Sequence, residues 1–90
     1  MRVTMFFHGG YSYAMFNTNR KRDAEEFPSL RAAVETFRKR TSGLDSRYPC
    51  TDESATAWVM LCDARVAIGA EYPDRTITIG KRGGLVVADA

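Results

Sequence analysis

The residues of this sequence best suited to chemistry are its one histidine and its two cysteines. His8 is followed by Gly9 and Gly10, and a His-Gly-Gly run occurs in the oxyanion loops of some esterases, where backbone N–H groups stabilise a negatively charged oxygen. Those enzymes also need a nucleophile in a Gly-x-Ser-x-Gly turn, which this sequence lacks. The one catalytic triad left is Cys50 with His8 and an acid such as Asp52. We expect no enzyme, because a histidine at a strand end and a structural thiol explain the same residues.

The sequence predicts neither a metal site nor a cofactor. Cys50 and Cys62 lie twelve residues apart, and with one distant histidine they do not have the paired spacing of a structural zinc site. The glycine-rich run Gly80-Lys81-Arg82-Gly83-Gly84 lacks the Gly-x-x-x-x-Gly-Lys-Ser/Thr pattern of a phosphate loop. It is typical instead of the tip of a β-hairpin.

Three clusters of basic residues could bind nucleic acid if the fold brought them to one surface. They hold eight of the thirteen positively charged residues: Arg20, Lys21, Arg22, Arg38, Lys39, Arg40, Lys81 and Arg82. Each cluster also has a structural explanation. The first is followed by three carboxylates, the second lies at the negative end of a helix dipole, and the third keeps a hairpin tip soluble. Nucleic-acid binding is therefore the alternative hypothesis.

These residues must be positioned by one predicted helix, from Ser29 to Arg40. Four apolar residues in it share one stripe at the helical period: Leu30, Ala33, Val34 and Phe37. Ser29 is a candidate N-cap, and the other register has Phe27 as the cap with Pro28 in the first turn. Gly43 is a natural residue with which to end the helix.

The remaining pattern predicts strands at residues 2–8, 11–16, 57–62, 75–79 and 85–88. Residues 17–26 form a polar connection in this prediction, and an extra strand near Val66 stays open because residues 64–70 are ambiguous. The predicted elements follow the order ββαβββ. This order predicts an α+β fold with one mainly antiparallel sheet of four to five strands and a single helix packed on one face. We expect residues 1–90 to form one domain.

The two most apolar strands, Val3–Phe7 and Trp58–Cys62, have apolar groups on both faces. One helix covers only one face of a sheet, so we expect a second protein to cover the other. The partner would be a second copy of this chain, a different protein, or both. The residues predicted for this interface are Phe6, Tyr48, Trp58, Met60 and Tyr72.

Composition is that of an ordinary soluble protein. The 13 basic and 11 acidic residues give a net charge of +2, which does not demand an acidic partner. No apolar run approaches the roughly 18 residues of a membrane span, and the start of the chain does not have the pattern of a signal peptide. Two cysteines are fewer than a disulfide-stapled secreted fold would carry. We expect no membrane association and a reducing cytoplasm.

Several short motifs occur together along nearly the whole chain. They are Gly9-Gly10 with Ser12-Tyr13, Phe27-x-Ser29, Tyr48-Pro49-Cys50-x-x-Glu53-Ser54, Tyr72-Pro73-Asp74-Arg75 and Gly80-x-Arg82-Gly83-Gly84. As a set they resemble a family of small uncharacterised proteins encoded by tailed phages of actinobacteria, in particular of mycobacteria. The resemblance implies an accessory protein in the host cytoplasm, host-directed or cytotoxic, that acts by protein–protein interaction. It assigns no catalytic or binding residues.

Overall fold

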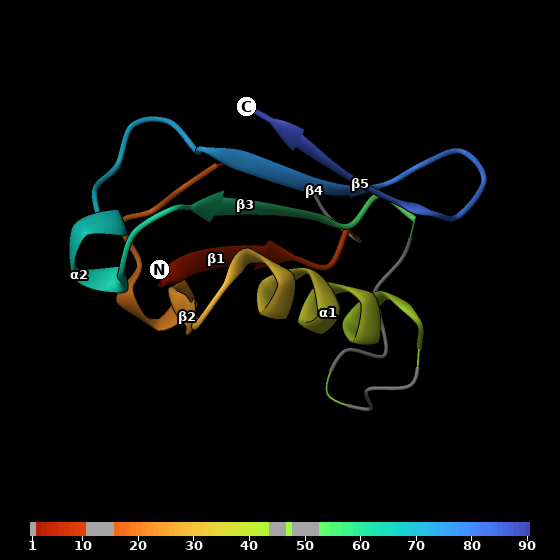
Figure 1. Cartoon of the computed structure of the whole chain (residues 1–90), viewed down its shortest axis with the longest axis horizontal. Helices are drawn as coiled ribbons and strands as arrows, with labels where there is room; N and C mark the ends of the chain where they lie inside the picture. The colour runs from red at the N-terminus through yellow and green to blue at the C-terminus, as the bar shows by residue number, and fades with distance from the viewer. Residues whose placement is uncertain (1, 11–15, 44–46, 48–52) are drawn as a thin grey trace.

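The computed structural model describes residues 2–10, 16–43, 47 and 53–90. Within them the chain forms a five-stranded antiparallel sheet in the order β2-β1-β3-β4-β5, with one main helix against it (Figure 1). The strands are β1 (Val3–His8), β2 (Glu25–Phe27), β3 (Thr56–Met60), β4 (Arg75–Ile79) and β5 (Leu85–Asp89). The helices are α1 (Leu30–Thr41), the short α2 (Ala64–Ala67) and the 3-10 turn η1 (Lys21–Asp23). The predicted α+β class is confirmed.

Helix α1 begins and ends where the sequence indicates. The Ser29 hydroxyl oxygen accepts the N–H of Ala32 at 3.1 Å, which settles the choice of N-cap in favour of Ser29. Three basic residues occupy the last turn, near the negative end of the helix dipole. Gly43 follows directly with a φ of +79°, a conformation that glycine adopts without strain.

The main core lies between α1 and one face of the sheet. Its buried residues come from the helix, from the three central strands β1, β3 and β4, and from the residue just before β3: Val3, Met5, Ala33, Phe37, Ala55, Ala57, Val59 and Ile77. The Phe37 ring meets the ring of Phe7 edge to face, with centroids 5.6 Å apart. Alternate residues of β1 and β3 supply this face, as the pleat requires.

The second strand is not where the sequence pattern indicated. Of the predicted strand at 11–16, residues 11–15 lie outside the described residues, and Phe16 is not in a strand. The strand β2 lies instead in the segment predicted to be a polar connection, and it pairs Phe27 with Val3 and Glu25 with Met5. A short edge strand needs few apolar side chains, because one of its sides faces solvent.

The ambiguous segment 64–70 contains the helix α2 and no strand. The Asp63 carboxylate caps this helix by accepting the N–H of Val66 at 3.0 Å. Gly69, with a φ of +88°, turns the chain just after it. The alternation of Val66 with Ile68 therefore belongs to a single helical turn and the residue that caps it.

The second face of β1 and β3 is covered by the chain itself. Phe6 and Met60 are only 3% and 5% exposed, and the side chains that pack with them come from two connecting segments: Phe16, Ala24, Cys62, Ala67 and Ala70. The Thr18 hydroxyl joins the two segments by donating to the Ala70 carbonyl at 2.8 Å. The expectation that a second protein must cover this part of the sheet is therefore wrong.

The edge strand β2 is held to α1 by an ion pair. Arg40 is buried, and its guanidinium donates to both carboxylate oxygens of Glu25, with 2.6 Å from Nη1 to Oε1. The guanidinium carbon also lies 5.1 Å from the centre of the Phe7 ring. The pair therefore connects the last turn of the helix, β2 and β1.

We predict that Glu25→Ala lowers the free energy of unfolding by about 3 kcal/mol, because it leaves the Arg40 charge buried without its carboxylate. The double variant Glu25→Ala/Arg40→Met should lose less than the sum of the two single losses. Urea denaturation measures all three. The control is Arg2→Ala, which removes only the exposed pair of Arg2 with Glu26 and should cost less than about 1 kcal/mol. A Glu25→Ala loss as small as that of the control would contradict this role.

Candidate protein-binding edge of the sheet

The two edges of the sheet differ in length and charge. β2 has three residues, and two of them are Glu25 and Glu26, both in ion pairs. β5 has five residues, of which four are apolar, and contains neither lysine nor proline. Charged side chains, proline and short length are the features that keep edge strands from pairing with other chains. Only β2 has them.

The pairing of β4 with β5 shows which backbone groups of β5 lie on the open side. Two hydrogen bonds mark the ends of the ladder. The N–H of Gly80 donates to the Gly84 carbonyl at 2.7 Å, and the N–H of Ala90 donates to the Asp74 carbonyl at 3.3 Å. Hydrogen-bonded pairs alternate along an antiparallel ladder, so Val86 and Ala88 also bond to β4. The other residues of β5 direct their N–H and C=O groups to the open edge: Leu85, Val87 and Asp89.

The side chains of β5 are also exposed on both faces of the sheet. Val86 is 46% exposed on one face and Val87 is 42% exposed on the other. Figure 1 shows why, since α1 lies along β1, on the far side of β3 from the β4–β5 hairpin. In the part of the chain that the structure describes, no strand pairs with the outer side of β5, so this edge combines open backbone groups with exposed apolar side chains. The run Leu85-Val86-Val87-Ala88, without lysine or proline, is the sequence signal that could have identified this edge.

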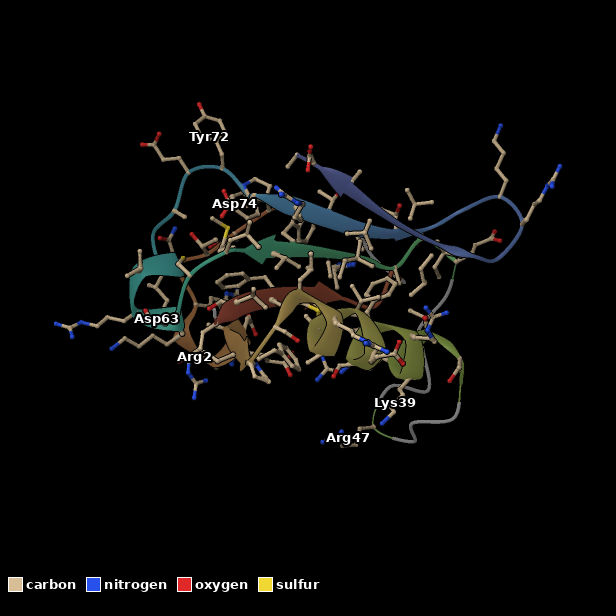
Figure 2. The ribbon with its side chains drawn as sticks, viewed as in Figure 1. Arg2, Lys39, Arg47, Asp63, Tyr72 and Asp74 are labelled. Carbon is tan, nitrogen blue, oxygen red and sulfur yellow. The ribbon has the colours of Figure 1, made fainter. Side chains whose placement is uncertain are left out.

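The residues predicted for the interface are not gathered on one surface. Phe6 and Met60 are buried within the chain and are corrected to core residues. Trp58 is half-buried, with its ring centre 5.9 Å from that of Phe16. Tyr72 is 78% exposed and points away from the body of the protein (Figure 2). Tyr48 lies outside the described residues.

Tyr72 lies near one end of the open edge. It precedes Asp74 by two residues, and the Asp74 carbonyl accepts the N–H of Ala90 directly after β5. Of the predicted interface residues that the structure describes, Tyr72 is therefore the one that the fold brings close to β5.

The basic clusters lie beside acidic side chains around the end of α1. Arg40 is corrected from a nucleic-acid contact to a buried partner of Glu25. Arg22 lines a hollow of about 300 Å³ together with Arg40, Asp23 and Glu25. Arg38 lines another, of about 420 Å³, that shares no residue with the first and includes Glu53 and Gly83.

The remaining basic residues of the three clusters are exposed: Arg20, Lys21, Lys39, Lys81 and Arg82. Figure 2 shows Lys39 pointing away from the sheet, on the side of α1. Lys81 and Arg82 lie in the turn between β4 and β5, where Gly83 has a φ of +83°. Carboxylates line the hollow at Arg22 and the hollow at Arg38, which weakens each as a place for phosphate.

The glycine turn after β1 contains a hydrogen bond to the neighbouring histidine. The N–H of Gly10 donates to Nδ1 of His8 at 3.0 Å, so this donor is already engaged and not directed at an oxyanion. A hollow of about 270 Å³ adjoins His8 and contains Arg20, Asp23 and Trp58. Cys50 and Asp52, the other members of the predicted triad, lie outside the described residues. Among the described residues no group of histidine, cysteine and acidic side chains could hold a metal ion.

Among the described residues, no helix is long and apolar enough to cross a membrane.

Burial raises the pKa of the Cys62 thiol, and the carboxylates of Asp74 and Asp63 raise it further. Asp74 is held near the thiol, because its carboxylate accepts the N–H of Leu61, the residue before Cys62, at 2.8 Å.

We predict that Cys62 reacts with iodoacetamide more slowly than an unstructured cysteine at pH 8. The raised pKa leaves less of the thiol as the reactive thiolate at this pH, and burial limits access. Alkylation should be followed by mass spectrometry in a Cys50→Ser background. The same chain in urea serves as the control, and equal rates in the two conditions would contradict the prediction.

Comparisons with known proteins give no match for this chain. No family model matches it, and neither a curated protein nor a solved structure is significantly similar to it. The β5 edge is therefore characterised by its own geometry.

Proposed function

We propose that this is a small phage-encoded accessory protein that binds a host protein in the cytoplasm of an actinobacterium, and that the β5 edge is its binding site. The motifs that resemble the phage family supply the biological setting of the proposal. The observation that carries the binding site is the contrast between β2, a short edge with two glutamates, and β5, a longer edge whose residues are apolar except for Asp89 at its end.

The chemistry of the β5 edge fits binding by strand addition. A partner segment in extended conformation would pair with the outward N–H and C=O groups of Leu85, Val87 and Asp89. Its side chains would cover Val86 on one face and Val87 on the other. Backbone hydrogen bonds give such complexes their affinity, and the exposed side chains select the partner.

Nucleic-acid binding is the weaker alternative. It would have to use the basic residues left exposed, because Arg40 is buried against Glu25. Those residues are divided between η1, the end of α1 and the hairpin turn, with acidic side chains among them. This function predicts affinity that falls steeply as salt rises.

The test is capture from a nuclease-treated actinobacterial lysate with tagged protein. We expect the wild-type chain to retain a discrete host protein, and Val87→Lys to lose it because a lysine on an edge strand opposes pairing. Val66→Lys is the matched control, since Val66 is also an exposed valine but lies on α2. It should retain the host protein.

Circular dichroism must show that both variants keep the fold. Capture that Val87→Lys does not reduce would contradict binding at β5. Recovery of proteins that disappear on nuclease treatment would favour the nucleic-acid alternative.

A further inference from the structure

We propose that the β5 edge also binds the β5 edge of a second copy of this chain, antiparallel about a two-fold axis at Val87. The two five-stranded sheets would then form one continuous sheet. This inference rests on the proposed use of β5 as a protein-binding edge, and it names one partner for that edge. It replaces the dimer predicted from the sequence, in which the covered surface was a face of the sheet.

The backbone pattern of β5 is complementary to itself. In an antiparallel pair about Val87, Val87 lies opposite Val87 of the second copy, and Leu85 lies opposite Asp89 of the second copy. Leu85, Val87 and Asp89 all direct their N–H and C=O groups outward, so each opposed pair can exchange both hydrogen bonds. Two-fold registers about Val86 or Ala88 leave at least one of the three outward residues without an opposite residue in β5.

The exposed side chains match in the same register. Val87 meets Val87 of the second copy on the face that carries α1, and Val86 meets Ala88 of the second copy on the other face. Both valines are nearly half exposed in the single chain, and pairing would remove much of this apolar surface from water. A contact of this kind, in which the same patch serves both subunits, is the usual basis of a two-fold dimer.

The charges at the two ends of β5 favour the antiparallel orientation. Lys81 and Arg82 lie in the turn just before β5, and Asp89 ends the strand with its carboxylate largely exposed. Antiparallel pairing sets the basic end of one strand beside the acidic end of the other, whereas parallel pairing would bring the two basic turns together. Within one chain the Asp89 carboxylate pairs with Arg75, with 3.0 Å between Oδ1 and Nε.

One β5 edge can pair with one strand at a time. A host protein that binds this edge would therefore compete with the second copy, and its capture should decrease as the concentration of the free chain rises. The dimer would keep an apolar edge covered until a host strand replaces it, which limits aggregation through the exposed edge.

The test places a cysteine at Val87 or at Val86 in a Cys50→Ser/Cys62→Ser background. Opposed residues in a hydrogen-bonded antiparallel pair have Cα atoms about 5.5 Å apart, a separation that a disulfide can span. We expect Val87→Cys to form a disulfide-linked dimer under mild oxidation. Val86→Cys is the matched control: Val86 is about as exposed as Val87, but it lies opposite Ala88 of the second copy, so this variant should form no disulfide-linked dimer.

Sedimentation of the wild-type chain completes the test. We expect the mass to rise from that of one chain, 10.1 kDa, to twice that value as concentration increases. A wild-type chain that stays monomeric at millimolar concentration, or equal cross-linking of the two cysteine variants, would overturn the proposed dimer. A monomer that still captures a host protein through β5 would leave the proposed function intact, and a dimer without capture would remove that function alone.

Discussion

β1 and β3 have apolar side chains on both faces, and the burial of both faces determines where the rest of this chain lies. On one face, Met5 and Val59 are buried with the apolar side of α1. On the other face, Phe6 and Met60 lie under two connecting segments, which the hydrogen bond from Thr18 joins together. The segments of the described residues that cover the central strands therefore do not reach the outer side of β5, where no strand pairs. The exposed β5 strand follows from this use of the chain.

The two edges of the sheet show opposite solutions to the same constraint. At β2 the unpaired backbone is short, and Glu25 binds the buried Arg40, so the edge is charged and fixed to the helix. At β5 the strand is longer, Val86 and Val87 are exposed, and the basic residues lie beyond the strand, in the hairpin turn. A protein that needed only to stay soluble would place charge in the middle of β5 as well. The one charged residue of β5, Asp89, lies at its end, and the exposed apolar stretch before it is the physical reason for assigning partner binding to this edge.

The parts of the fold that follow local rules could be predicted from the sequence. Ser29 and Gly43 bound a helix with one apolar stripe, and Gly83 supplies the conformation that the hairpin turn requires. β2 could not be predicted, because its stability comes from pairing with β1 and from an arginine fifteen residues away. The covering of the second face was missed for a related reason, since it depends on a contact between Thr18 and Ala70 across the chain. The open groups of β5 become visible only when the register with β4 is known.

In the proposed complexes β5 pairs on both sides, whereas within the described residues of the single chain it pairs only with β4. Amide hydrogen exchange followed by NMR measures this directly, because each N–H of the strand is observed separately. In dilute solution the N–H groups of Val86 and Ala88 should be protected by β4, and those of Leu85, Val87 and Asp89 should exchange quickly. At high concentration, or with a captured host protein, the second group should become protected as well. Exchange at Val87 that stays fast in both conditions, while Val86 stays protected, would contradict a binding role for this edge.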